Sequence, residues 1–186
     1  IPVDEEIRRF NGFLALWPEI VATSKPRDAE QVWPPILSAN TWRPPVIAEI
    51  LTSGKIELVN DMSGLPDDRN AQLCALTGAS LLIMHSVGEP KIPHLTQQWD
   101  DVMGSLDSFF AEKLALAESA GLSPDSIILD PGIDFAKQRD DNLAIYRQLD
   151  RLGKFARPLL IPVSRKTVIG EVLGQPEGVG DAALAL

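Results

Sequence analysis

The sequence predicts an α/β protein in which short parallel strands alternate with helices. Five apolar segments, at residues 32–39, 56–59, 80–84, 126–129 and 158–163, each have the length of one strand. They are continuous apolar runs, most clearly from Leu81 to Met84, and strands covered by helices on both faces have this composition. Strand–helix alternation implies right-handed parallel crossovers. Periodicity alone does not distinguish an open doubly wound sheet from a closed barrel.

Helical patterns lie before and between these segments, with apolar residues at steps of three and four. The expected helices span residues 4–26, 41–54, 96–121 and 143–149. Thr41 and Thr96 suit the N-caps of the second and third helices. Gly54 suits the position just beyond the second helix, and Gly121 the end of the third.

Length and composition narrow the class of protein. The chain has 186 residues, of which 45% are hydrophobic, so we expect one domain with an ordinary core. A net charge of −9 argues against sequence-independent binding to nucleic acid. Cys74 is the only cysteine, which excludes an internal disulfide, and no Cys/His group has zinc-ligand spacing. No apolar run approaches eighteen residues and no secretory signal is recognisable, so we expect a cytoplasmic protein without a membrane partner.

Polar residues follow every predicted strand. In chain order they are Asn40, then Asn60 and Asp61, then His85 and Ser86, then Asp130, and finally Ser164, Arg165 and Lys166. In both parallel architectures ligands bind at the carboxyl ends of the strands, so we expect these side chains to line one mouth. Each residue also has a structural interpretation. Asp61 could cap a helix, Asp130 could hold a tight turn before Pro131 and Gly132, and His85 could be a core histidine.

Carboxylate, amide and ammonium groups at one mouth suit a flat heterocycle that carries donors beside acceptors. A carboxylate accepts two parallel N–H bonds, an amide matches one donor and one acceptor, and a lysine bonds a carbonyl or ring nitrogen. A pterin, with its 2-amino group, N3–H and 4-oxo group, presents such an edge. The sequence contains no glycine-rich phosphate loop of the P-loop or Rossmann kind.

Four motifs carry a resemblance to a known family. They are Asn-Asp-Met-Ser-Gly at 60–64, Met-His-Ser-Val-Gly-Glu-Pro-Lys at 84–91, Asp-Pro-Gly-Ile with Phe135 and Lys137 from 130, and Ser-Arg-Lys at 164–166. In this order and at roughly this spacing they resemble the dihydropteroate synthase family. The resemblance extends over nearly the whole chain.

The resemblance implies a TIM-type (β/α)8 barrel, of which five or so β/α units are visible here. We therefore expect residues 1–186 to form a single pterin-binding domain that is incomplete at both ends. The family's first two strands and its last strand are not recognisable, and the chain begins at Ile1 rather than at a methionine. An open piece of a barrel would expose sheet edges, so we expect these residues to belong to a longer chain.

The family condenses p-aminobenzoate with 6-hydroxymethyl-7,8-dihydropterin pyrophosphate in folate biosynthesis, and it releases pyrophosphate with the help of Mg²⁺. Its magnesium-ligand loop is not in this sequence. The resemblance also implies a homodimer whose partners are these two small molecules.

By the same resemblance, Asn60 and Asp130 bind the pterin edge, and Lys166, which we also assign as a catalytic residue, bonds the ring from its other side. Ser164 and Arg165 lie towards p-aminobenzoate. The other residues of the motifs that we assign to substrate binding are Met84, His85, Phe135 and Lys137.

Two positions depart from the family pattern. Asn40 stands where the family typically has Asp, and Asp134 replaces a glycine between Gly132 and Phe135. If the family's Asp stabilises a cationic methylene as pyrophosphate leaves, Asn40 is a catalytic residue that supplies only a dipole, and turnover should be slow. In a competing hypothesis, Asp134 supplies the missing charge from the neighbouring loop.

Two other functions stay open. One is a degenerate, non-catalytic pterin-binding domain, which the two departures and the missing ends favour. The other is a related barrel that uses methyltetrahydrofolate in corrinoid-dependent methyl transfer. The motifs at 84–91 and 164–166 favour the synthase.

Overall fold

The computed structural model describes residues 1–24, 26, 28, 33–88, 90, 92, 94 and 96–175. Its four strands, β1 (Ser38–Asn40), β2 (Leu58–Asp61), β3 (Ser80–Met84) and β4 (Ile127–Asp130), form one parallel sheet in the order β1-β2-β3-β4. The helices are α1 (Val3–Thr23), α2 (Pro44–Leu51), α3 (Arg69–Thr77), α4 (Val102–Ser119), α5 (Arg139–Arg147), α6 (Leu149–Leu152) and α7 (Thr167–Val172). Two short 3₁₀ turns, η1 (Pro124–Ser126) and η2 (Gly153–Phe155), complete the described elements.

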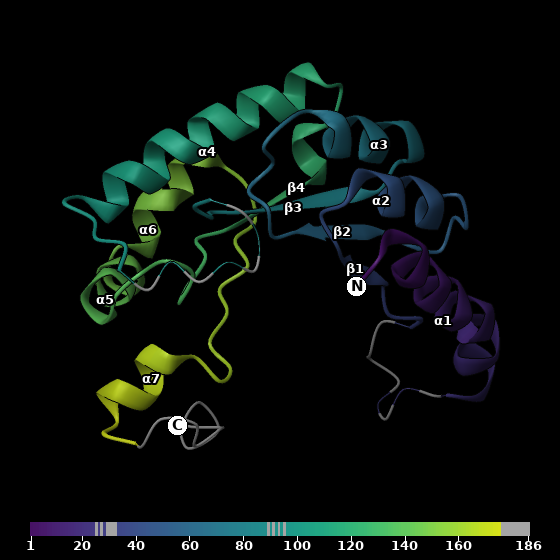
Figure 1. Ribbon diagram of the computed structural model, residues 1–186, viewed down its shortest axis with the longest axis horizontal. Coiled ribbons are helices and arrows are strands. Elements are labelled where there is room, and N and C mark those ends of the chain that lie inside the picture. Colours follow the sequence, from purple (N-terminus) through teal and green to yellow (C-terminus); the bar gives the residue numbers. More distant parts are fainter. Residues whose placement is uncertain are drawn as a thin grey trace.

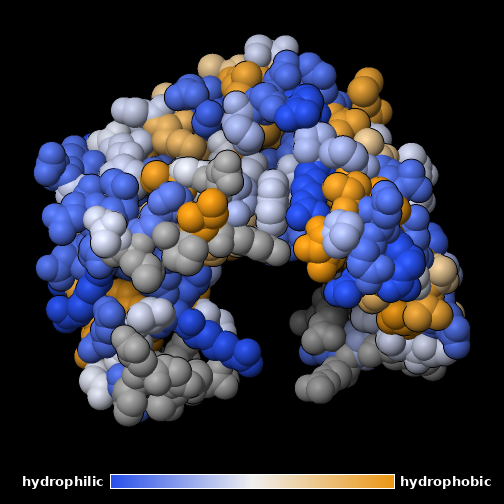
Figure 2. Space-filling view, viewed as in Figure 1, coloured by the Kyte–Doolittle hydropathy of each residue, from blue (hydrophilic) through white to orange (hydrophobic). Residues whose placement is uncertain are grey.

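These elements form an arch (Figure 1). Helices α1 to α4 lie along the outer side of the sheet, and the inner side is open. The space-filling view shows the hollow between the arm that carries α1 and the arm that carries α5 and α7 (Figure 2). Within the described ranges, no helix is long and apolar enough to cross a membrane.

Four of the five predicted strands are confirmed, and the fifth is wrong. At 158–163 the chain makes a single parallel bridge, between Leu129 and Leu159. Its two hydrogen bonds join Leu129 N–H to the Pro158 carbonyl (3.0 Å) and Leu160 N–H to the Leu129 carbonyl (2.8 Å). Pro162 has no N–H to donate, so the ladder cannot continue as a regular strand. The first predicted strand is also shorter than expected, since it begins at Ser38, and residues 29–32 lie outside the described ranges.

Two predicted helix caps are wrong. The Thr41 hydroxyl donates to Glu6 on α1 (2.7 Å) instead of capping α2, whose N-cap residue is Arg43. Helix α4 begins after Asp101, whose side chain accepts from Gly104 N–H (2.8 Å), so Thr96 lies before it. Helices α3 and α7 were not predicted, because they are short and present few apolar residues at helical spacing.

The sheet separates two apolar layers. On the outer face Val59, Leu81, Ile83 and Leu129 pack against the helices in the main core. The inner face carries a smaller cluster: Leu58, Leu82 and Met84, with Met62, Ile128 and Phe135 half-buried beside it. Because side chains alternate along a strand, successive residues of β2, β3 and β4 belong to different layers.

The outer layer should provide most of the stability. Phe110 of α4 is fully buried and its ring contacts Phe109 and Phe155 edge to face, at centroid distances of 5.5 and 5.8 Å. We expect Phe110→Ala to lower the free energy of unfolding by about 3–5 kcal/mol, through lost burial and a residual cavity. Leu76→Ala is the control, because Leu76 is 83% exposed and the change should cost less than about 0.5 kcal/mol. Urea unfolding measures both, and equal costs would contradict this assignment of the core.

Candidate functional site at the carboxyl ends of the strands

Strand register places four of the predicted site residues, three polar and one apolar, on the same inner face of the sheet. Asn40 is in register with Asn60, and Met84 with Asp130. Asn60 is in register with Leu82, two residues before Met84, so all these side chains share one face. The three polar residues therefore lie at the carboxyl end of the open side of the arch, with Met84 among them. Asn40 is exposed, Asn60 is half-buried and Asp130 is 6% exposed.

Asp130 is a buried carboxylate with one bond from its own loop. Its Oδ1 accepts from Gly132 N–H at 2.7 Å. Burial raises the pKa of Asp130, while the Gly132 N–H and the charges of Lys166 and Lys137 act in the opposite direction. The tight turn that the sequence suggested is therefore present. It requires glycine, because Gly132 has φ +67° and a Cβ there would lie 2.2 Å from the His85 carbonyl oxygen.

Lys137 is buried beneath this loop. Its Nζ contacts the Gly132 carbonyl (2.9 Å), the Phe135 carbonyl (3.1 Å) and Nδ1 of His85 (2.9 Å). Three acceptors match the three hydrogens of an ammonium group. Burial nevertheless lowers the pKa of Lys137 to about 7, partly offset by the charge of Asp130. With 7% of its surface exposed and its head group bonded to three acceptors, Lys137 shapes the loop.

His85 follows β3 but points to the outer side of the sheet. Its ring contacts Trp99 and Phe109, at centroid distances of 5.3 and 4.8 Å, and it is 2% exposed. Since Nδ1 accepts from Lys137, we assign the ring proton to Nε2, which lies 3.4 Å from the Ser105 hydroxyl. Burial, and then the nearby Lys137 charge, lower the pKa of His85 to about 3. The geometry matches the core-histidine interpretation.

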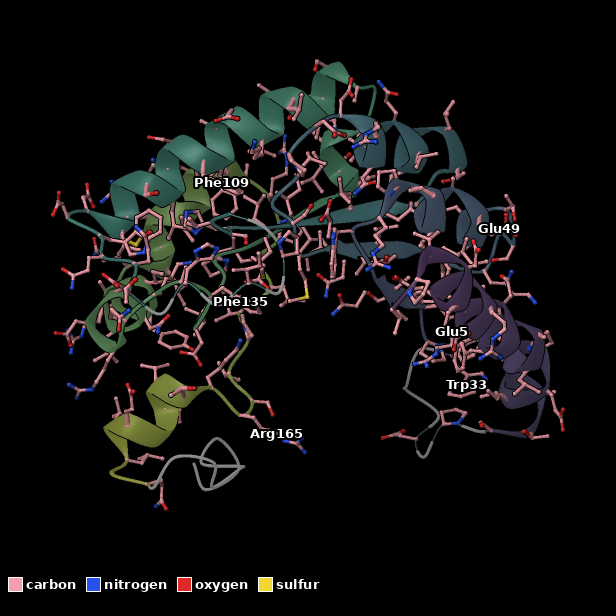
Figure 3. The ribbon with its side chains drawn as sticks, viewed as in Figure 1. Glu5, Trp33, Glu49, Phe109, Phe135 and Arg165 are labelled. Carbon is pink, nitrogen blue, oxygen red and sulfur yellow. The ribbon has the colours of Figure 1, made fainter. Side chains whose placement is uncertain are left out.

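Lys166 reaches the loop that follows β4. Its Nζ donates to the Ile133 carbonyl (2.9 Å) and lies 5.1 Å from the centre of the Phe135 ring. Burial lowers the pKa of Lys166, while Asp134 and Asp130 raise it. Ser164 and Arg165 are exposed beside it, and Arg165 has φ +55°. Figure 3 shows Phe135 and Arg165 on the inner side of the arch.

A cavity of about 520 Å³ opens between the loops that follow β2, β3 and β4 and helices α5 and α7. Its lining includes Trp42, Met62, Ser86, Phe135, Arg139 and Thr167. More than half of the lining residues are polar or charged, and Asn60, Asp130 and Lys166 are not among them, so this cavity lies beside the polar strand ends rather than over them.

Asp61 has a structural role, but the capping interpretation is wrong, because the N-cap residue of α3 is Asp68. It is fully buried, and it accepts from Ser63 N–H (2.7 Å) and from the Asn70 amide (2.9 Å). Burial raises the pKa of Asp61. Cys74 is also buried, which raises the pKa of its thiol to about 12 and keeps the thiolate scarce near neutral pH.

Two residues of the site were missed by sequence reasoning. Trp99 donates its indole N–H to the Ala136 carbonyl (2.7 Å), which fixes the far end of the loop after β4. Asn142 of α5 exchanges hydrogen bonds with Asp134. Neither residue belongs to a recognisable motif, and both reach the loop through tertiary contacts.

The described residues contain no group of three His, Cys, Asp or Glu side chains that could hold a metal ion. The magnesium that the resemblance implies therefore does not fit the donor set of these residues on their own.

The chain belongs to the pterin-binding enzymes, since residues 2–185 match the family described as "Pterin binding enzyme". Among curated relatives, dihydropteroate synthase of Synechocystis sp. is 36% identical over 142 residues, which cover 76% of this chain and 49% of that protein. The chain thus spans about half the length of the curated relative.

Solved structures give the fold. The dihydropteroate synthase of Stenotrophomonas maltophilia matches with a TM-score of 0.80 and 26% identity, over 94% of this chain and 61% of that one. The Thermus thermophilus enzyme matches in its complex with 4-aminobenzoate (TM-score 0.70, 36% identity, 80% and 58% covered). It also matches in its complex with 6HMPPP (TM-score 0.67, 35% identity, 80% and 54% covered). The fold class is therefore the TIM-type β/α barrel, and the four described strands form an arc of it.

The burial of His85 predicts a specific dependence of stability on pH. The pKa of His85 is about 3 in the folded chain and about 6.5 as its ordinary value, so below pH 6.5 the unfolded chain binds the extra proton. The contribution of His85 to the free energy of unfolding is therefore complete above pH 6.5. It decreases on acidification, by about 2 kcal/mol at pH 5. His85→Gln keeps an acceptor for Lys137 but does not titrate. Urea unfolding should show that the free energy of unfolding falls less between pH 8 and pH 5 in the variant than in the natural chain. An equal fall in both would contradict a buried neutral histidine.

Proposed function

We propose that this chain provides the pterin-binding part of a dihydropteroate synthase in folate biosynthesis. The reaction condenses p-aminobenzoate with 6-hydroxymethyl-7,8-dihydropterin pyrophosphate, giving dihydropteroate and pyrophosphate. The observation that carries this proposal is the convergence of Asn60, Asp130 and Lys166 at the carboxyl ends of the strands, on the open side of a barrel arc. Residues 1–186 would form a single domain.

The hydrogen-bonding capacity of these groups supports a pterin ligand. Asp130 uses one oxygen for Gly132 N–H and keeps lone pairs for the 2-amino and N3–H groups of the ring. Within the described ranges, the Asn60 amide makes no hydrogen bond, so it is available to a donor–acceptor pair. Lys166 retains two hydrogens beyond its bond to the Ile133 carbonyl, and it would bond the ring from the opposite side.

The positive charges of Lys166 and Arg165 suit an anionic substrate, although the chain as a whole has a net charge of −9. Figure 3 shows Arg165, the residue before Lys166, on the inner side of the arch. Ser164 and Arg165 would lie towards p-aminobenzoate. The Phe135 ring and the apolar side chain of Met84 would offer apolar contact below the ring. His85 and Lys137 would support the site from beneath, through the loop that they hold.

In the proposed reaction the bond between the pterin methylene carbon and the pyrophosphate oxygen breaks, and its electron pair leaves with pyrophosphate. The aniline nitrogen of p-aminobenzoate forms the new C–N bond and then loses a proton. Positive charge develops on the methylene carbon, so a nearby anion or dipole accelerates the step. Asn40 lies on the inner face in register with Asn60 and would supply such a dipole.

The complexes of the Thermus thermophilus relative with 4-aminobenzoate and with 6HMPPP support small-molecule substrates of these two kinds. A role for Mg²⁺ stays a prediction for the complete protein, with ligands from outside the described residues, and no step here is assigned to it. The homodimer and the cytoplasmic localisation also stay predictions.

Asn40 favours one second candidate, a pterin-binding domain with little or no turnover. Strands β2 and β3 lie between β1, which carries Asn40, and β4, which precedes Asp134. The Asp134 carboxylate also accepts hydrogen bonds from Thr167 N–H and the Asn142 amide. The geometry therefore does not favour the hypothesis that Asp134 supplies the negative charge that Asn40 lacks, and this supports a domain with little turnover.

Asp130→Ala should weaken the binding of dihydropterin pyrophosphate about tenfold or more. Loss of a buried charge-assisted pair costs roughly 1.5–3 kcal/mol, which corresponds to that range. Asp125→Ala is the matched control, because Asp125 is exposed in η1 before β4, at the opposite end of the sheet. Isothermal titration calorimetry measures the affinities. An unchanged affinity in a folded Asp130→Ala chain would contradict the proposed pterin site.

Asn40→Asp should raise turnover in the complete protein by about a hundredfold, with little change in pterin affinity. Amide and carboxylate are nearly isosteric, and a preorganised electrostatic contact in the transition state is worth about 3 kcal/mol. Ser38→Asp is the control, because Ser38 is exposed on the same strand and face but two residues nearer the amino end. Steady-state kinetics on both variants measure the effect. If neither changes turnover, Asn40 has no electrostatic role.

A further inference from the structure

We propose that Asp134 is a positioning residue that holds Lys166 and the start of α7 in place over the site. The inference rests on the proposed function, because Lys166 is the residue through which Asp134 would affect pterin binding. Asp134 lies in the loop after β4, and Lys166 lies 32 residues later, at the end of the segment that replaces the expected fifth strand. The bond from Asp134 to the backbone of Thr167, the residue after Lys166, therefore joins the loop after β4 to the start of α7.

The Asp134 carboxylate is bound on both oxygens. Its Oδ2 accepts from Thr167 N–H at 2.6 Å, and its Oδ1 accepts from the Asn142 amide at 3.0 Å. Asn142 returns the bond, because its Oδ1 accepts from Asp134 N–H at 3.0 Å. Asn142 is 2% exposed in α5, so it is a fixed anchor. Asp134 thus links α5 to the beginning of α7.

Helix α7 lacks a cap of its own. Its N-cap residue, Lys166, makes no side-chain capping bond, and its first turn contains no acidic residue. Thr167 N–H is one of the unpaired donors that begin every helix. The carboxylate of Asp134 satisfies it from another element, and a carboxylate at a helix N-terminus is also favoured by the helix dipole.

Lys166 is held by three consecutive residues. The Ile133 carbonyl accepts from its ammonium group, the Phe135 ring lies 5.1 Å from that group, and Asp134 fixes the peptide nitrogen that follows it. The loop therefore controls both the head group and the backbone of Lys166. In the segment before it, Val163, Ser164 and Arg165 are exposed, and the Tyr146 hydroxyl donates to the Pro162 carbonyl at 2.9 Å.

The backbone explains which residues can occupy this position. Asp134 has φ +65°, a left-handed conformation that glycine adopts freely and that Asp and Asn adopt more readily than most residues. A glycine here would keep the turn but would have no carboxylate. The Asp134 side chain therefore adds a link to α7 that the shape of the loop itself does not require.

The test compares Asp134→Gly, Asp134→Asn and the control Ser123→Ala. Ser123 accepts from Asp125 N–H at the start of η1, at the far end of β4, so its loss removes a cap that is remote from the site. Hydrogen exchange of a peptide covering residues 164–173 should be at least tenfold faster in Asp134→Gly and unchanged in Ser123→Ala. Asp134→Asn retains one acceptor oxygen and should lie between them.

Affinity for dihydropterin pyrophosphate gives the second readout. Asp134→Gly should weaken binding about three- to tenfold in the natural background. In the background of Lys166→Met it should cost nothing further, because the residue through which it acts is gone. Additive losses in the double variant, or unchanged exchange at 164–173 in Asp134→Gly, would overturn the positioning role. If the natural chain binds no pterin, the proposed function fails, and the exchange measurement alone then decides whether Asp134 holds α7.

Discussion

The enclosure of Lys137 by three acceptors is the interaction on which the candidate site depends. Its bonds to the Gly132 and Phe135 carbonyls fold the segment after β4 into a compact loop, and its contact with His85 attaches that loop to the end of β3. Asp130 begins the loop, and Phe135 projects from it. A buried lysine is costly unless its hydrogens are satisfied, so the same bonds that shape the loop make the burial tolerable.

The parallel sheet then determines what this loop can face. The alternation of side chains sends Val59, Leu81 and Ile83 to the helices and leaves Asn60 and Asp130 on the open side. The apolar residues Leu82 and Met84 lie between these polar groups on the inner face. A flat heterocycle resting there would meet apolar atoms below and hydrogen-bonding groups at its edges, which is the arrangement that small-molecule sites generally have.

Charge is distributed unevenly over the molecule. The chain as a whole is acidic, yet the charges of Lys137 and Lys166 both act on Asp130 at the end of β4, and Arg165 precedes Lys166 on the inner side of the arch (Figure 3). Asp130 and Asp134 stand among these cations, and both raise the pKa of Lys166 against the effect of burial. Under the proposed function, the cations would face the phosphorylated part of the ligand, and Asp130 with Asn60 would face the neutral ring.

The sequence by itself determined the α/β class, four of the strands and the positions of the polar residues at their ends. Continuous apolar runs and the motifs at Asn60, His85 and Asp130 carry that information locally. It could not determine that 158–163 makes only one bridge, because pairing depends on a neighbour as well as on apolar composition. Nor could it show that Thr41 bonds Glu6, 35 residues earlier in the chain, instead of capping α2.

Tertiary structure alone decided how the residues around the loop divide their roles. Lys137 shares a motif with Asp130, and His85 belongs to the motif after β3, yet both face beneath the loop, because side-chain direction depends on strand register and on the turn at Gly132. Asp134 finds Thr167 and Asn142 only once β4, α5 and α7 are assembled. Such contacts join residues that are distant in sequence, and they depend on the packing of whole elements rather than on any local pattern.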